Sequence, residues 1–132
     1  MTMIELRRGD VVLVAFPFVA ESQVQRKRRP ALVVQSDRYN RRRAVVIIAA
    51  ITSTRAYRQL PCKVPVAKDS LEGREAGLRL DSVVDCQTLV TVPRTEIIVR
   101  LGKFPTETMC QIDQALKDAL GLTGKEGHES PR

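Results

Sequence analysis

Three short apolar runs stand out in the first half of the chain: Asp10–Phe16, Ala31–Val34 and Ala44–Ile51. All three are rich in Val and Ile, which pack well on a pleated sheet. Short apolar runs bounded by polar residues are typical of buried strands. We therefore predict strands over Asp10–Phe16, Ala31–Gln35 and Ala44–Ile51, with Phe16-Pro17-Phe18 closing the first strand and opening a loop.

The second half shows a similar pattern of short apolar runs separated by turn residues. Prolines on both sides of Cys62–Val64 favour an edge strand there, because proline cannot donate to a sheet ladder. The polar, glycine-containing stretch Ala67–Arg79 is predicted to be a loop. Leu80–Asp85 is predicted to be a strand, with Thr88–Val92 as its continuation or its partner. A further strand is predicted over Ile97–Leu101, ended by Gly102, with a helical turn at Arg94–Glu96.

A single long helix is predicted near the C-terminus. It opens at Pro105, with Thr106 as N-cap, and Gly121 ends it. Apolar residues at spacings of three and four predict one buried stripe along this helix. The residues of this stripe are Met109, Ile112, Leu116 and Leu120.

Several short strands followed by one late helix indicate a mostly β fold with an antiparallel sheet. A length of 132 residues suits a single domain. We place that domain at residues 1–122 and predict that the polar remainder, 123–132, is a disordered tail. No run of about 18 apolar residues predicts a membrane helix, and no signal peptide is evident, so we expect a cytoplasmic protein.

Positive charge is concentrated in one segment. Residues 26–58 hold ten arginines and lysines against Asp37 alone, a net charge of +9, whereas the whole chain carries +7. Arginine suits bidentate recognition of phosphate. One interpretation is a mouth that binds a polyanion such as nucleic acid; the other is a solvated cationic rim that binds nothing.

Metal and disulfide chemistry receive little support. The only histidine, His128, lies in the polar tail, and Asp and Glu are scattered. Cys62, Cys86 and Cys110 are widely spaced, and we predict that all three are small buried apolar residues. We expect no metal site and no cofactor.

Three motifs carry a family resemblance. RRGDVVLVAFPF, KRRPALVVQSDRYN and VIIAAITS occur in that order, and together they resemble the MazF/PemK toxin endoribonucleases, in particular the branch with Phe-Pro-Phe after its first strand. The likeness runs from Arg8 to Leu122. It implies an SH3-like antiparallel barrel that forms a homodimer. It also implies metal-independent cleavage of single-stranded RNA, leaving a cyclic phosphate and a 5′-hydroxyl, and an acidic antitoxin as partner.

Metal-free RNA cleavage needs groups that stabilise negative charge developing on the phosphate. Arg29 precedes Pro30, which favours an extended backbone and so a defined exit for the arginine side chain. The resemblance places the catalytic arginine at Arg29, although Arg28 competes at this stage. It places the catalytic threonine at Thr52, with Ser53 as helper. The alternatives are one more surface cation and a hydroxyl that bonds to its own backbone.

Further side chains are predicted to bind RNA. Gln87 and Thr91 match a polar pair on a strand that faces the site in the resembled family, whereas Val90 stands where some members carry arginine. The remaining candidates are basic. The full predicted RNA-binding set is Arg26, Lys27, Arg28, Arg41, Arg42, Arg43, Arg55, Gln87 and Thr91.

Two other functions stay open on sequence alone. The first is a non-enzymatic inhibitor on the same fold, like the CcdB proteins that poison gyrase. The second is a nucleic-acid-binding module with an inactive site. The pairing of Arg29-Pro30 with Thr52 favours the nuclease, because neither alternative needs it.

Overall fold

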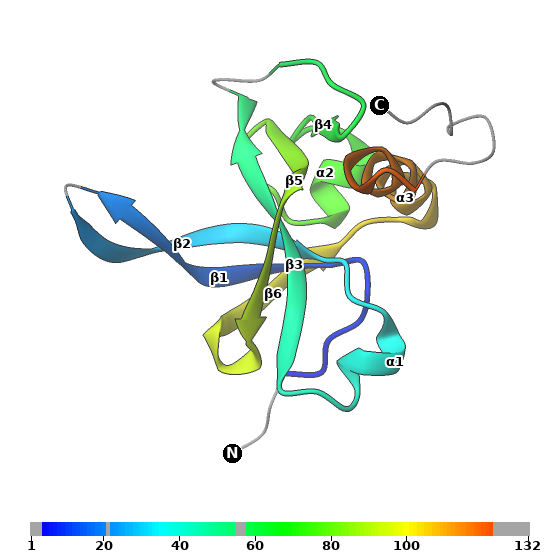
Figure 1. The fold of residues 1–132 in the computed structure, drawn as a ribbon. Helices are drawn as coiled ribbons and strands as arrows, with labels where there is room; N and C mark the ends of the chain where they lie inside the picture. Colours follow the sequence, from blue (N-terminus) through cyan, green and yellow to red (C-terminus); the bar gives the residue numbers. More distant parts are fainter. Residues whose placement is uncertain (1–3, 21, 55–57, 123–132) are drawn as a thin grey trace.

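One antiparallel sheet forms the framework of the protein (Figure 1). The computed structural model describes residues 4–20, 22–54 and 58–122, and in that part of the chain six strands follow the order β4-β5-β3-β2-β1-β6. The strands are β1 (Asp10–Ala20), β2 (Gln23–Val33), β3 (Val45–Ser53), β4 (Lys63–Val66), β5 (Ser82–Pro93) and β6 (Ile97–Lys103). The helical elements are α1 (Asp37–Asn40), α2 (Leu71–Glu75), η2 (Arg94–Glu96) and α3 (Thr106–Leu120).

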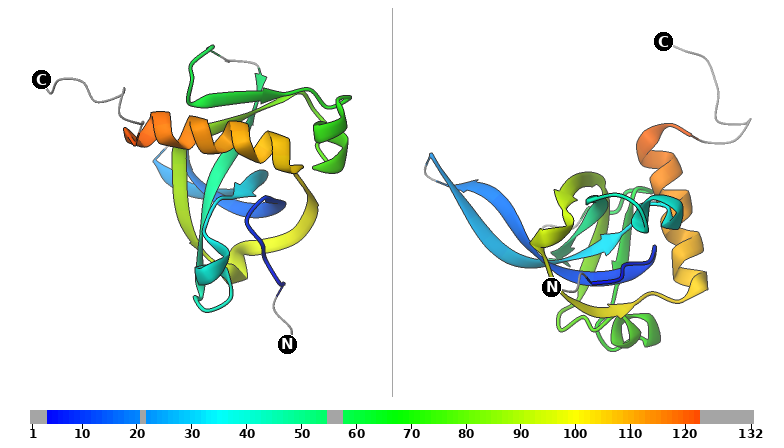
Figure 2. Two further views of the ribbon diagram at one scale, coloured as in Figure 1. Left: turned by 90° about the vertical axis from the view of Figure 1, so that its right-hand side faces the viewer. Right: turned by 90° about the horizontal axis from the view of Figure 1, so that it is seen from below.

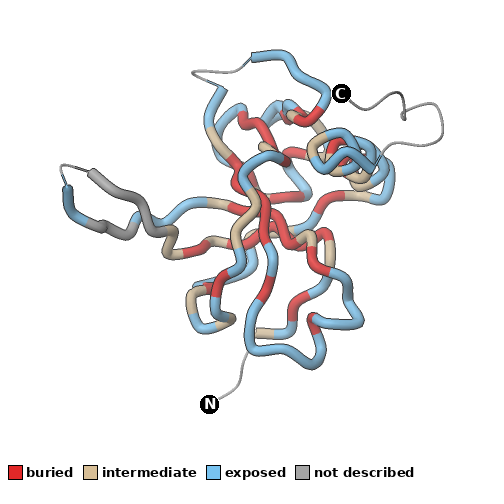
Figure 3. The backbone as a smooth tube through the Cα atoms, in the orientation of Figure 1, coloured by how far each residue is buried: buried red, intermediate tan, exposed pale blue. Residues whose placement is uncertain are grey.

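Both faces of the sheet are buried. Helix α3 packs across one face, where Ile112 and Ala115 join a core cluster that includes Leu32 of β2 and Ile51 of β3 (Figure 2). A second cluster on the other face gathers Val12 and other β-strand residues. The buried residues accordingly concentrate along the crossing strands (Figure 3). The predicted mostly β fold with a C-terminal helix is confirmed. Among the described residues the outer strands β4 and β6 do not pair with each other, so the sheet is open and not closed into a barrel.

The first two strands are longer than the sequence pattern predicts. β1 pairs with β6 only over Asp10–Val14, and β2 pairs with β3 only over Ala31–Val33. Beyond these points the two strands pair with each other alone and project as a two-stranded ribbon (Figure 1). The loop predicted after Phe16 is therefore wrong, because the chain continues as strand to Ala20. The pattern hides this because a ribbon outside the core needs no apolar alternation.

Other local predictions also change. The stretch predicted as a loop at Ala67–Arg79 contains α2, which Ser70 caps through a 3.0 Å hydrogen bond from Gly73 N–H. Of the two possibilities for Thr88–Val92, the structure shows continuation, because β5 is one strand with a bulge. Strand β6 runs through Gly102, whose predicted role was to end it. Glycine is required there because a Cβ would lie 2.1 Å from the Glu75 carbonyl oxygen.

The helix at the C-terminus is largely as predicted. Gly121 ends it in the left-handed conformation, with φ of 72°. Its N-cap is Pro105, without a side-chain bond, so the predicted capping by Thr106 is wrong. Leu120 is 56% exposed and leaves the predicted buried stripe, while Ala115 is buried. None of the helices in the described ranges is long and apolar enough to cross a membrane.

The three cysteines have different environments. Cys62 and Cys86 are buried, as predicted, and Cys86 N–H donates to the Cys62 carbonyl oxygen at 3.0 Å. Burial, with smaller contributions from Asp85 and Cys62, raises the pKa of the Cys86 thiol to about 12. Cys110 is exposed on α3, so its predicted burial is wrong.

Candidate functional site

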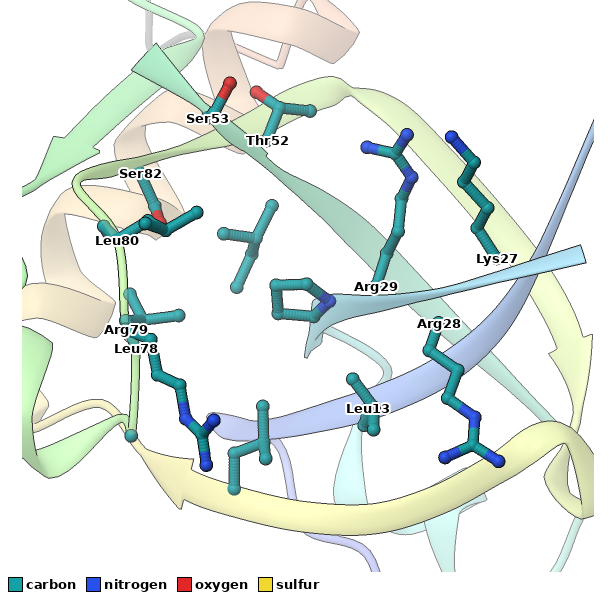
Figure 4. Close-up of a pocket in the computed structure, with 14 residues that line it drawn as sticks. Leu13, Lys27, Arg28, Arg29, Thr52, Ser53, Leu78, Arg79, Leu80 and Ser82 are labelled. Carbon is teal, nitrogen blue, oxygen red and sulfur yellow. The ribbon is translucent and has the colours of Figure 1, made fainter. Parts of the chain in front are cut away.

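A pocket of about 570 Å³ opens where β2 and β3 separate (Figure 4). The ladder between these strands ends at Ala31 and Ala50, and β3 continues beside β5 to Ser53. We call this cavity the fork pocket. Its lining residues are Leu13, Lys27, Arg28, Arg29, Pro30, Ile51, Thr52, Ser53, Gly77, Leu78, Arg79, Leu80, Ser82 and Leu101.

Pro30 explains why the strands separate here. Val33 accepts from Gly9 N–H on the β1 side, and Val34 N–H donates to Ile47 of β3. Because backbone groups alternate in direction along a strand, position 30 faces β3. A proline has no N–H to offer there, so the ladder with β3 does not continue past Ala31.

The strand register places Arg29 and Thr52 on one face of the sheet. Ala31 is paired with Ala50, and stepping two residues outward on each strand sets Arg29 opposite Thr52. Side chains two residues apart share a face. Figure 4 agrees: the Arg29 side chain extends toward the end of β3 that carries Thr52 and Ser53. Arg29 is exposed and Thr52 is half-buried, so both are accessible from the pocket.

The same alternation separates the neighbouring cations. Lys27 extends in the direction of Arg29, whereas Arg28 extends the opposite way, as Figure 4 shows. Arg29 is thus the arginine of this pair whose side chain is directed toward Thr52. Strand direction therefore places Arg29, and not Arg28, on the side of Thr52, while the catalytic role of Arg29 stays a prediction.

Apolar residues form much of the rest of the pocket. Ile51 and Leu78 are almost fully buried, and Leu80, 65% exposed, stands at the rim. The Ser82 hydroxyl donates to the Leu80 carbonyl oxygen at 2.7 Å, so its proton is already used in a local hydrogen bond. Sequence reasoning did not assign Leu78, Arg79 or Leu80 to the site, because Leu78 and Arg79 end a stretch predicted as a loop and tertiary packing brings all three to the pocket.

The chemistry of the lining set is that of an anion site. Its charged members are Lys27, Arg28, Arg29 and Arg79, and none of the lining residues is acidic. Cations beside apolar walls stabilise negative charge more strongly than they do in bulk water. Within the described residues no group of three His, Cys, Asp or Glu side chains is placed to hold a metal ion.

Among the described side chains, the predicted binding residues Arg41–Arg43, Gln87 and Thr91 do not line the pocket. Arg41–Arg43 follow α1, at the end of β3 opposite to the pocket (Figure 1). Gln87 sits in the β5 bulge, and Thr91 is paired with Ile47. Arg26 lies in β2 opposite Pro17. Arg55 is outside the described residues. The single positive mouth expected from the sequence is therefore divided into two separate regions.

Comparisons with known proteins agree on one family. A family model described as "PemK-like, MazF-like toxin of type II toxin-antitoxin system" matches residues 7–120. Endoribonuclease MazF6 of Mycobacterium tuberculosis is 40% identical over 97 residues, covering 73% of this chain and 81% of that protein. Endoribonuclease MazF of Staphylococcus epidermidis is 30% identical over 125 residues, covering 95% of this chain and 99% of the relative.

Solved structures show the same fold. A structure titled "Endoribonuclease from Mycobacterial species" superposes with a TM-score of 0.68 at 26% identity, covering 92% of this chain and 96% of that one. An endoribonuclease from Mycobacterial species in complex with its cognate antitoxin gives the same TM-score and identity, covering 89% of this chain and 97% of the other.

Proposed function

The chain belongs to the PemK-like, MazF-like toxins of type II toxin-antitoxin systems, and from this premise we propose that it is an endoribonuclease which cuts single-stranded RNA in the fork pocket. The observation that carries the proposal is the placement of Arg29 and Thr52 on one face of the fork. Relatives at 30–40% identity bear the name endoribonuclease, which supports the same activity.

The proposed reaction uses the 2′-hydroxyl of RNA as nucleophile. Its oxygen attacks the adjacent phosphorus as its proton passes to solvent water, the bond to the 5′-oxygen breaks, and that oxygen takes a proton from water, so the products are a cyclic phosphate and a 5′-hydroxyl. Negative charge develops on the phosphate oxygens, and the Arg29 guanidinium stabilises it without any change of protonation. Thr52 and Ser53 supply hydroxyl donors to the same phosphate. The step requires no metal ion or cofactor.

The other cations of the pocket bind rather than react. The side chains of Lys27 and Arg28 extend from β2 in opposite directions. They are proposed to hold the phosphates on either side of the cleaved bond. The exposed apolar side chain of Leu80, at the rim of the pocket, offers a surface for an RNA base. Base preference follows from the shape of this rim and of the ribbon.

An acidic antitoxin is the proposed restraint. The groups that attract phosphates also attract carboxylates, and a segment that folds on binding can cover a large surface. It is proposed to cover the fork pocket and the β1–β2 ribbon and so to compete with RNA. The similar solved endoribonuclease was captured with its cognate antitoxin. The functional unit is proposed to be a cytoplasmic homodimer.

The test is cleavage of a labelled mixed RNA pool in EDTA. The protein should give discrete fragments with 5′-hydroxyl ends, and adding the product of the neighbouring reading frame should abolish them. An intact pool would overturn the nuclease and favour a CcdB-like inhibitor, which a gyrase supercoiling assay would then reveal. Binding to RNA with no cleavage under any condition would identify an inactive binding module.

A further inference from the structure

A second cationic surface surrounds α1, far from the fork pocket. Arg38, Arg41, Arg42 and Arg43 are all exposed, and together with Tyr39 they form what we call the α1 patch. Strand β3 begins beside this patch and ends at the pocket. From Val45 to Thr52 the strand advances by seven residue-to-residue steps, or about 23 Å at a rise of about 3.3 Å per residue. The α1 patch is therefore a separate surface.

An aromatic ring organises the patch. The guanidinium carbon of Arg43 lies 5.8 Å from the centroid of the Tyr39 ring, and that of Arg38 lies 6.0 Å from it. These distances are within the range of cation–π attraction. The ring is nevertheless 43% exposed. An aromatic face among guanidiniums is the combination that single-stranded nucleic acids contact through both phosphates and bases.

Buried hydrogen bonds hold the backbone of this patch in place. The Asn40 side chain, 1% exposed, donates to the carbonyl oxygen of Gln35 and to the carboxylate of Asp37, each at 2.9 Å. Gln35 in turn donates to Asn40 and to the Val45 carbonyl oxygen at 3.0 Å. The arginines therefore project from a backbone that is already ordered before any ligand binds, which reduces the entropic cost of binding.

Asp37 offsets only a small part of the positive charge of the patch. Asp37 is the only acidic residue between positions 26 and 58, and it accepts from the backbone N–H of Arg8 at 2.7 Å. In the described part of the chain none of the four patch arginines forms an ion pair with a carboxylate. Such a charge cluster is suited to a polyanion that releases its counterions on binding.

We propose that the α1 patch is a second RNA-binding surface, which holds the same strand whose scissile bond lies in the fork pocket. The proposal rests on the ribonuclease function above. At the helical spacing of about 3.4 Å per phosphate, bridging about 23 Å takes about seven nucleotides, and an extended single strand needs fewer. The patch therefore adds to the affinity of strands that are long enough to reach both surfaces. Tyr39, as an exposed ring among the arginines, favours RNA over an acidic protein segment.

The test measures binding against salt with 2′-O-methylated single strands, which lack the free 2′-hydroxyl needed for cleavage. One strand has about three nucleotides, too few to bridge about 23 Å even when extended, and the other has about twenty. For the variant R41Q/R42Q/R43Q, the log–log salt slope on the long strand should flatten by about 2, that is, about 0.7 for each of three lost phosphate contacts. The slope on the short strand should equal that of the parent.

A matched control removes the same charge elsewhere. Lys68, Arg74 and Lys117 are exposed and line neither the pocket nor the patch, so K68Q/R74Q/K117Q should leave both slopes unchanged. Tyr39→Leu keeps every charge and should weaken binding of the long strand without altering its slope. The proposal is overturned if the two triple variants show the same salt slope on the long strand. It is also overturned if R41Q/R42Q/R43Q flattens the salt slope on the short strand as much as on the long one.

Two further outcomes have separate meanings. If the α1 variant binds long RNA like the parent but loses affinity for polyglutamate, the patch belongs to an acidic protein partner and the RNA assignment is wrong. The ribonuclease function is tested by a different assay, the incubation of unmodified RNA with the parent protein in EDTA. If the RNA remains intact there, the proposed function is wrong whatever the binding assay shows.

Discussion

Replacement of Arg29 by alanine tests the proposed chemistry most directly. A guanidinium about 4 Å from a phosphate charge contributes about 4 kcal/mol at an effective dielectric of about 20. Removing one positioned charge stabiliser from an enzyme costs about 2.7–4 kcal/mol, or 10²- to 10³-fold in rate. Arg29 is exposed at the mouth of the pocket, where water screens it. We therefore expect the lower end, a loss of about 10²-fold in kcat.

The neighbouring residue supplies a matched control. Arg28→Ala removes the same charge from the same strand, but its side chain extends away from Thr52 (Figure 4). It should raise KM and leave kcat close to that of the parent. Arg29→Lys keeps the charge but loses the bidentate fork, so it should recover only part of the activity. Single-turnover cleavage of a fluorescent RNA measures all three variants, and equal kcat losses in R28A and R29A would refute the assignment.

Three other predictions concern the hydroxyl group, the thiols and the single acid of the basic segment. Thr52→Val should lower the single-turnover cleavage rate at least tenfold and Thr52→Ser should restore most of it, if the hydroxyl contacts the reacting phosphate; equal rates in the two variants would contradict that role. Iodoacetamide at pH 8 should label Cys110 alone in the native protein, because Cys62 and Cys86 are buried and the pKa of Cys86 is raised to about 12, and mass spectrometry should find three labels only after unfolding. Burial opposes ionisation of Asp37, but hydrogen bonds and nearby arginines outweigh it and lower its pKa below 3.8. Its stabilising contribution is therefore present above about pH 3.8 and is lost as the pH falls through the folded-state pKa. Asp37→Asn should cost about 1 kcal/mol in urea unfolding at pH 7, with the difference shrinking below pH 3.8, and a difference that is independent of pH would contradict the ionic contribution.

The apolar pattern was sufficient to predict the sheet but not its full extent. Val and Ile runs marked the parts of β1, β2 and β3 that lie in the core, since burial is what the pattern records. In the β1–β2 ribbon, the β1 stretch Phe16–Ala20 is a continuous apolar run broken by Pro17, whereas the β2 stretch Gln23–Arg29 is mostly polar and basic. Neither stretch shows the alternation of a half-buried strand, and the ribbon is formed by backbone pairing between the two strands, so the sequence predicted a loop there.

The site was predictable in part for a related reason. The motifs identified Arg29, Thr52 and Ser53, and the structure brings them to one pocket. The sequence could not show that Arg41–Arg43 lie at the other end of β3, because closeness along the chain does not say at which end of a strand a residue emerges. The wall at Leu78–Leu80 was missed because tertiary packing, rather than local pattern, brings it to the pocket.

The pocket itself follows from a single missing donor. Pro30 faces β3 without an N–H, so the β2–β3 ladder stops at Ala31 while the pairing of β2 with β1 continues. The two strands must then separate, and the next outward residues on that face, Arg29 and Thr52, border the gap rather than packing against each other as a cross-strand pair. An Arg-Pro dipeptide thus has two consequences in this fold: the proline ends the ladder and opens the fork, and the arginine before it places a positive charge at the opening, which we propose is the charge that binds the phosphate.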